Sequence, residues 1–332
     1  MRRVIAALLL LVVNVACSAS PPGVSSTSSS PADGTTPPAP SASPAAVSPS
    51  PTAVTTPTPR ATPRPAMNAR AALRDIVQLA SDIGPREATS DNFREAATFV
   101  EARFKRLGYD VRRTSVPVPS GVSWGTPVRR GTSLNVIAEP KDFDPKEPHV
   151  VIGAHLDTVP VAPGAEDNAS GIAVMLQLAA MVSQQPTALP VQFIAFGAEE
   201  PRGSGDALHH FGSRQHVADL SRSERRAVRA MVALDRVGVR ASYVPICSAT
   251  DRGSQLRDAM RAAARRTDIP TRGCTNYTSD HWSYAKAGVP AVRLGSIPYA
   301  GYHSRGDVPK VVDRRQLDRV GRTVWAWLQS LN

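Results

Sequence analysis

The sequence predicts an α/β domain with a three-layer α/β/α architecture around a central mixed, mostly parallel sheet. Short apolar runs rich in β-branched residues alternate along the chain with segments whose apolar residues recur at helical spacing. Strands that are apolar throughout are buried on both faces, so helices must cover both sides of the sheet. The alternation of the two patterns therefore predicts the layers as well as the elements.

The elements follow in order along the chain. Two amphipathic helices are expected at residues 68–84 and 92–108, each closing on a glycine. Residues 109–118 alternate in polarity, which indicates an exposed strand. Buried strands are expected at residues 133–139, 149–155, 191–198 and 230–238. Further helices are expected at residues 171–185, 254–267 and 314–331.

The amino-terminal segment 1–17 has the pattern of a signal peptide. Two arginines precede an apolar run that is too short to span a bilayer comfortably. The sequence VNVAC around Cys17 resembles the lipobox of bacterial lipoproteins, in which the cysteine becomes the lipidated first residue, although Asn14 stands where that motif usually has Leu. We expect an exported protein that is lipid-anchored on the outer face of the cell membrane, or otherwise secreted.

A linker is expected to follow the signal peptide. Residues 18–66 consist almost entirely of Ser, Thr, Pro and Ala. Such a segment cannot bury enough apolar surface to offset its ordering entropy, so we expect it to be disordered and stiffened by proline. Its simplest use is to hold a domain, expected at residues 67–332, away from a membrane.

The chain is strongly basic, with a formal net charge of +11. A solvated arginine-rich surface accounts for this charge, and the alternative is attraction to an anionic cell envelope. The sequence has neither zinc-finger spacing nor basic residues interleaved with aromatic ones, so no nucleic-acid partner is expected.

Two cysteines, Cys247 and Cys274, lie in the expected folded domain. The exported location favours a disulfide between them. A metal role is less favoured, because two cysteines alone make a poor zinc site.

Titratable residues follow three of the expected strands at their carboxyl ends. His155 ends one apolar run, Glu199 and Glu200 follow another, and Asp235 follows a third. Functional residues of open α/β sheets gather at this edge. Imidazole and carboxylate groups are the usual zinc ligands outside sulfur sites, and so many groups suit two zinc ions that share a carboxylate. The candidate set is His155, Asp157, Asp167, Glu199, Glu200, Asp235 and His303.

Six segments resemble one known family when taken in order. They are AHLDT, EDNASG, GAEEPRGSG, ALDRVG, SDHWSYAKAGVPAV and YHSRGD. Together they resemble the secreted di-zinc aminopeptidases of metallopeptidase family twenty-eight, which have a zinc exopeptidase-like fold. The resemblance implies that His155 and Asp235 hold one zinc, that Glu200 and His303 hold the other, and that Asp167 bridges them. Mn or Co could replace zinc.

The same resemblance implies roles for three more side chains. Glu199 would be the general base that takes a proton from the attacking water. Tyr302 would hydrogen-bond the oxyanion of the tetrahedral intermediate. The Asp157 carboxylate would fix the imidazole of His155. A cis peptide bond is implied between Asp167 and Asn168.

The implied activity is release of amino-terminal residues from peptides with a free amino terminus. The carboxypeptidase-like deacylases also fit HLDTVPV, but they lack DNASG and the closing YHS. A glutaminyl cyclase or another amide hydrolase of the same fold remains an alternative, as does a non-catalytic binding protein with a peptidase fold. Five other histidines are interpreted as surface or packing residues, namely His149, His209, His210, His216 and His281.

Overall fold

The structure is a computed structural model, and it describes residues 64–331. The predicted signal peptide 1–17, Cys17 and nearly all of the predicted linker therefore lie outside the described residues. Within the described part, no helix is both long and apolar enough to cross a membrane.

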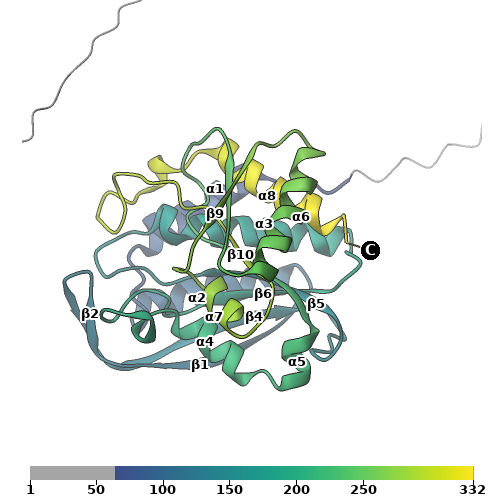
Figure 1. Ribbon diagram of the computed structural model, residues 1–332. Helices are drawn as coiled ribbons and strands as arrows, with labels where there is room; N and C mark the ends of the chain where they lie inside the picture. Colours follow the sequence, from purple (N-terminus) through teal and green to yellow (C-terminus); the bar gives the residue numbers. More distant parts are fainter. Residues whose placement is uncertain (1–63, 332) are drawn as a thin grey trace, which may run out of the picture. The chain divides into compact units, whose positions relative to one another are not determined.

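The centre of the domain is an eight-stranded sheet (Figure 1). Four of its seven strand pairings are parallel and three are antiparallel, which confirms the predicted mixed, mostly parallel sheet. The parallel core runs in the order β6, β5, β7 and β10. In spatial order the strands are β1 (Asp110–Val118), β4 (Gly131–Glu139), β6 (Val191–Phe196), β5 (His149–His155), β7 (Val228–Leu234), β10 (Ala291–Leu294), β8 (Val244–Ser248) and β9 (Thr271–Thr275).

Helices cover both faces of this sheet, so the three-layer architecture is confirmed (Figure 1). One face carries the larger apolar core and is covered by α1 (Ala69–Val77), α2 (Asp91–Arg106), α3 (Ser170–Gln184), α6 (Asp251–Arg265) and α8 (Arg314–Leu328). The other face is covered by α4 (Phe211–Asp219), α5 (Arg222–Ala227) and α7 (His281–Lys286). Helix α3 lies in the middle of the first layer, which is why most of its side chains are buried.

Local sequence signals explain where several helices begin. The Ser90 side chain accepts a hydrogen bond from the backbone of Phe93 and so caps α2, and Thr250 caps α6 in the same way. Asp313 caps α8. The π-helix η1 (Gln78–Ile83) continues α1 to Gly84, so the first expected helix is a helix in two parts.

The sequence patterns missed the shortest strands. Strands β8, β9 and β10 have four or five residues each, too few to show a period. A separate hairpin of β2 (Gly121–Ser123) and β3 (Thr126–Val128) was also not expected. It is fixed near the carboxyl end of β6, because the backbone of Val122 donates a hydrogen bond to the carbonyl of Arg202.

The topology brings three strand ends together. Because β5, β6 and β7 are adjacent and parallel, the residues that follow them meet at one edge of the sheet. The π-helical turn η2 (Ala165–Ala169), directly before α3, reaches the same edge. This edge therefore collects the residues that the sequence singled out.

Candidate metal centre

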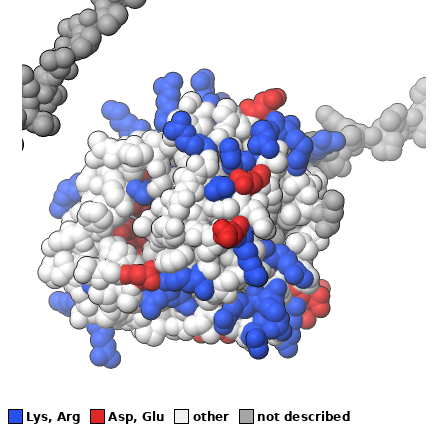
Figure 2. Space-filling model, in the orientation of Figure 1, with Lys and Arg blue, Asp and Glu red and all other residues white. Residues whose placement is uncertain are grey.

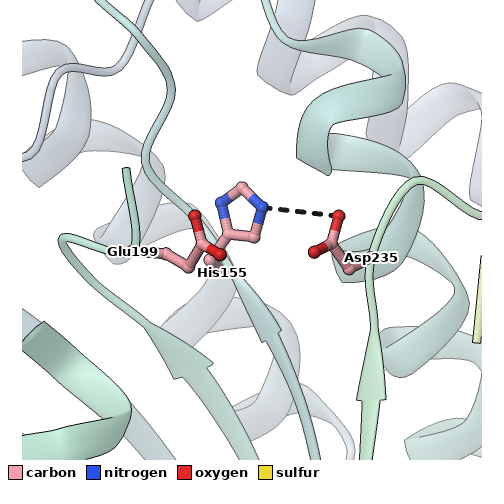
Figure 3. Close-up of side chains that lie close together, drawn as sticks. All are labelled: His155, Glu199 and Asp235. Atoms are coloured by element: carbon pink, nitrogen blue, oxygen red, sulfur yellow. Dashed lines mark ion pairs between the residues drawn. The ribbon is translucent and has the colours of Figure 1, made fainter. Parts of the chain in front are cut away.

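Three candidate residues come from three neighbouring strands. His155 is the last residue of β5, Asp235 directly follows β7, and Glu199 lies three residues beyond β6. Their side chains project toward one another (Figure 3). One ligand atom from each lies within 4.8 Å of the others, and all three residues are buried. The strand ends thus assemble an imidazole and two carboxylates without help from a long loop.

Asp167 lies between two histidine–carboxylate pairs. Its Oδ1 is 3.1 Å from Nε2 of His155, and the same nitrogen is 3.8 Å from Oδ1 of Asp235. Its Oδ2 is 3.0 Å from Nε2 of His303, which is 3.3 Å from Oε1 of Glu200. The structure therefore brings together all five predicted ligands, with Asp167 in the middle.

These residues line a cavity of about 230 Å³. Glu199 and Tyr302 line it too, so seven of the predicted site residues share one space. Trp124, His209, His210, Arg236 and Arg293 complete much of the wall. The cavity is therefore rich in carboxylates but also contains two guanidinium groups.

The electrostatics of the cluster favour a bound cation. Burial and the charge of Asp167 raise the pKa of Glu200 to about 8. Burial lowers the pKa of His155, but the carboxylates of Glu199 and Asp167 outweigh burial and hold this pKa well above its ordinary value. Without a metal ion, Glu200 thus resists ionisation and the other carboxylates draw a proton to His155, and a bound cation would relieve both effects.

The donor atoms themselves fit a metal. Nε2 of His303 lies close to two carboxylates, but neither contact has hydrogen-bond geometry, and among the described residues this nitrogen has no hydrogen-bond partner. The same holds for Oε1 of Glu200. Buried polar atoms are normally satisfied, so these orphaned atoms are what a site built for metal ions would leave.

Asp157 supports the site in a different way from the one that the family resemblance implies. Its carboxylate is 3.9 Å from Nδ1 of His155, too far for a hydrogen bond, and the imidazole instead contacts the main-chain carbonyl of Asp157 at 3.1 Å. The two carboxylate oxygens accept hydrogen bonds from the backbone N–H groups of Glu199 and Glu200, at 3.0 and 3.1 Å. Asp157 thus positions the loop after β6 with its side chain and His155 with its backbone.

A second carboxylate that the sequence did not reveal holds the backbone at Asp167. The oxygens of Asp307 accept hydrogen bonds from the backbone N–H groups of Glu166 and Asp167, at 2.8 and 3.0 Å. The Asp167–Asn168 peptide bond is cis, which confirms the expectation from the resemblance. The Asn168 side chain donates to the carbonyl of Leu234, which joins this turn to the end of β7.

The loop between His155 and the turn η2 closes around Arg86. This fully buried guanidinium donates hydrogen bonds to the carbonyls of Leu156, Pro163 and Gly164. The loop carries the chain from one predicted ligand to the next, so Arg86 fixes its path. No sequence spacing linked Arg86 to the site.

Aromatic rings form one side of the cavity. The ring of Tyr302 stacks on that of His303, with centroids 3.7 Å apart. Trp124, at the tip of the β2–β3 hairpin, places its ring 4.2 Å from the His303 ring and is 57% exposed. Trp124 therefore stands at the rim of the cavity.

The structure also revises the interpretation of the other histidines. His210 is not a surface or packing residue, because its Nε2 lies 3.3 Å from Oε1 of Glu199 inside the cavity, and His209 lines the same wall. His281 is buried and contacts the carbonyl of Asn276, so packing describes it. His149 and His216 are buried packing residues as well.

Cys247 and Cys274 form a disulfide in the structure. They are directly paired across the parallel strands β8 and β9. The bridge thereby ties the edge strand β9 to the rest of the sheet. Shortly after β9 the chain reaches Thr278, which lines the cavity.

Comparison with known families agrees with this geometry. Residues 135–328, more than half of the chain, match the family described as Peptidase family M28. The chain belongs to peptidase family M28.

Curated relatives of this M28 protein carry aminopeptidase names. Aminopeptidase YwaD of Bacillus subtilis is 31% identical over 206 residues, which are 59% of this chain and 44% of the relative. Probable lipoprotein aminopeptidase LpqL of Mycobacterium tuberculosis is 27% identical over 224 residues, 64% of this chain and 42% of the relative. The chain thus covers less than half the length of these relatives.

Solved structures show the same fold. BSAP, a zinc aminopeptidase from Bacillus subtilis, superposes with a TM-score of 0.68 at 19% identity, covering 80% of this M28 chain and 95% of that chain. A glutaminyl cyclase from Bacteroides thetaiotaomicron gives a TM-score of 0.68 at 20% identity, covering 81% and 100%. At these identities the likeness concerns the fold, so the activity must be argued from the site.

Proposed function

We propose that the protein is a zinc-dependent aminopeptidase that releases residues from the free amino terminus of peptides. The observation that carries this proposal is the position of Asp167 between the His155–Asp235 and His303–Glu200 pairs. The aminopeptidase names of the M28 relatives support it.

The five predicted ligands would hold two zinc ions, for which Mn or Co could substitute. His155 and Asp235 would hold one, Glu200 and His303 the other, and Asp167 would contact both. When bound, such ions acidify a water molecule and polarise the scissile carbonyl. The orphaned atoms of His303 and Glu200 support this assignment.

Glu199 would act as the general base. Burial raises the pKa of its carboxyl, but the imidazoles of His155 and His210 outweigh burial and hold this pKa below its ordinary value. The carboxylate is therefore ionised at neutral pH and would accept the proton of the attacking water and pass it to the leaving amine. It is also the nearest candidate to hold the substrate's free amine.

Tyr302 would donate a hydrogen bond to the developing oxyanion. Burial raises the pKa of this phenol, so its hydroxyl keeps its proton at neutral pH. Stacking on His303 orients the ring. A fixed donor of this kind stabilises charge that appears only in the transition state.

We further propose that residues 1–17 are a signal peptide, that Cys17 carries a lipid, and that residues 18–66 link it to a peptidase domain at residues 67–332. The name of the mycobacterial relative, a probable lipoprotein aminopeptidase, supports the lipid anchor. The first described helix begins at Ala69, which fits the proposed domain start. The face in Figure 2 carries many more Lys and Arg than Asp and Glu side chains, which would suit an anionic envelope.

The proposal is tested with matched peptides. The zinc-loaded protein is incubated with peptides that have either a free or an acetylated amino terminus, and the products are identified by mass. We expect stepwise loss of residues from the free peptides only. Cleavage of both forms, or of neither, would contradict an aminopeptidase. A peptide with an amino-terminal glutamine that loses only ammonia would instead identify a glutaminyl cyclase. This alternative is supported by the solved glutaminyl cyclase that shares the fold.

A further inference from the structure

We propose that Arg236 and Arg293 form a subsite that binds a carboxylate of the substrate beside the metal centre. This inference rests on the proposed aminopeptidase function and names the class of peptide that the enzyme prefers. The carboxylate would come either from an acidic first residue or from the free carboxyl terminus of a dipeptide. Both sources present the same planar, doubly accepting group to an arginine.

The two guanidinium groups reach the cavity from neighbouring strands. Arg236 directly follows the predicted ligand Asp235, and Arg293 lies on β10, which pairs with β7. Nη2 of Arg293 is 3.0 Å from Oδ2 of Asp235, while Nε of Arg236 is 3.7 Å from Oδ1 of the same residue. Two arginines therefore share one carboxylate at the cavity wall.

The charge balance of the cavity changes when metal ions bind. The ionisable carboxyl groups that line it are Asp167, Glu199, Glu200 and Asp235, and the lining arginines are Arg236 and Arg293. Two divalent cations would balance the charge of the four carboxylates, so the two guanidinium groups would leave the metal-loaded cavity with a net positive charge. Arg293 is only 1% exposed, and its carboxylate partner Asp235 would be shared with Arg236 and with a metal ion, which leaves the buried cation poorly compensated. An anionic group on the substrate would restore the balance.

Both side chains have donors to spare. Nη1 of Arg293 is oriented by the carbonyl of Thr278 at 3.1 Å, but its Nε has no hydrogen-bond partner within residues 64–331. Arg236 donates from Nη2 to Oγ of Ser296 at 2.6 Å, and its guanidinium lies 4.2 Å from the centre of the Tyr302 ring. These contacts hold each guanidinium in place, so free N–H groups are presented in a fixed orientation.

The size of the cavity agrees with a small anionic group. Its volume of about 230 Å³ is below the roughly 300–1,000 Å³ of pockets for drug-sized ligands. The space suits one or two amino-acid residues. A carboxylate close to the scissile bond is therefore within reach of the arginines, whereas one at the far end of a long peptide is not.

Two pairs of substrates separate the two sources of the carboxylate. Glutamyl and glutaminyl p-nitroanilides differ only in the side chain, and both lack a terminal carboxylate. Leucyl-leucine and its amide differ only in the terminal carboxylate. The quantity measured is the ratio of kcat/KM for the charged member to that for the neutral member. We expect a ratio above one in one of the two pairs, which identifies the source.

Variants of Arg236 then test whether its guanidinium binds the substrate carboxylate. In Arg236→Gln we expect this ratio to fall by about tenfold, the usual effect of losing a hydrogen bond to a charged group. Arg236→Lys keeps the positive charge but loses the paired N–H donors of the guanidinium, so the ratio should fall less. The matched control is Arg272→Gln, whose guanidinium stacks on Tyr243 at a similar 4.3 Å but lies on the exposed edge strand β9. It should leave the ratio unchanged.

Failure of the carboxylate subsite can be distinguished from failure of the proposed aminopeptidase function. If neither member of either pair is hydrolysed and the free peptides of the first test are not cleaved either, the proposed function fails. The subsite is then tested by calorimetry of glutamate against glutamine binding to the zinc-loaded protein. Tighter glutamate binding that Arg236→Gln abolishes would support the subsite. A kcat/KM ratio of one or less in both substrate pairs would overturn the subsite. Where nothing is hydrolysed, equal binding of glutamate and glutamine would overturn it. So would a preference that Arg236→Gln leaves intact.

Discussion

The imidazole of His155 is held by the main-chain carbonyl of Asp157, at 3.1 Å from Nδ1, and not by its carboxylate. The carboxylate is thereby free to accept the backbone N–H groups of Glu199 and Glu200. One residue thus sets the positions of a predicted ligand, a predicted base and a second predicted ligand. The support of the centre runs through backbone groups, so it depends on the shape of two loops as well as on side chains.

Asp157→Asn should lower kcat by about 10- to 100-fold, the usual effect of changing a partner of metal ligands. The new amide turns one acceptor into a donor that faces a backbone N–H, so the loop carrying Glu199 and Glu200 must shift. Steady-state kinetics of the purified variant measure the loss. Asp144→Asn, in a loop before β5, serves as the control and should be neutral. An Asp157→Asn enzyme with unchanged kcat would show that the loop does not need this carboxylate.

Glu199→Gln should reduce kcat by about 10²- to 10⁴-fold while the zinc content stays the same. Gln keeps the shape of the side chain but cannot take a proton. Glu199 also lies near enough to His155 and Asp235 to be a ligand itself, so zinc content decides between the two roles. Glu200→Gln is the companion variant and should lose metal. Loss of zinc from Glu199→Gln would mean that Glu199 is a ligand and not the base.

Trp124→Ala should raise KM several-fold with little change in zinc content. The indole stands at the cavity rim, and its removal takes away apolar contact surface for the substrate without touching a ligand. Trp124→Phe should restore most of the affinity. If Trp124→Ala instead lowered kcat alone, the ring would be acting through the orientation of His303.

His216 should make the fold sensitive to acid. Burial lowers its pKa to about 3, and its Nδ1 lies 2.7 Å from the hydroxyl of Tyr284. The unfolded chain takes up this proton near pH 6.5, so the stabilisation is present above that pH and is lost as the pH falls toward 3. Each pH unit in this window should lower the free energy of unfolding by up to about 1.4 kcal/mol.

His216→Gln isolates this contribution. Urea unfolding of the metal-free protein at several pH values between 4 and 6.5 should give a shallower pH dependence for the variant than for the parent. Using the metal-free protein removes the effect of metal release at low pH, and the titration of the predicted ligands is common to both proteins. Identical slopes would show that folding does not lower the pKa of His216.

The sequence could predict the central strands of the sheet and half of the residues that line the cavity, because those signals are local. Apolar runs mark β5, β6 and β7, and the rule that sites form at strand ends is enough to group His155, Glu199 and Asp235 from the sequence alone. Asp167 and His303 were candidates by residue type, but neither follows a strand in the sequence pattern, so their places in the ligand set came from the resemblance.

The positions of the remaining site residues depend on tertiary contacts, which the periodicity of apolar residues in the sequence does not reveal. Trp124 reaches the site because a short hairpin is fixed against the backbone of Arg202, and nothing in its own segment indicates that target. His210 adjoins Glu199 only through the turn before α4. The resemblance implied support of His155 by the Asp157 carboxylate, whereas in the structure the main-chain carbonyl of Asp157 contacts the imidazole, a difference of backbone geometry that a sequence motif does not contain.

Metal stoichiometry tests the central claim most directly, since Asp167 is placed to join two metal sites. The parent protein and Asp167→Ala are dialysed against zinc buffers, and the bound metal per chain is measured by elemental analysis. The arrangement of His155, Asp235, Glu200 and His303 around Asp167 predicts two zinc ions in the parent and loss of both at moderate zinc in the variant. One zinc in the parent, or two in the variant, would contradict a centre bridged by Asp167.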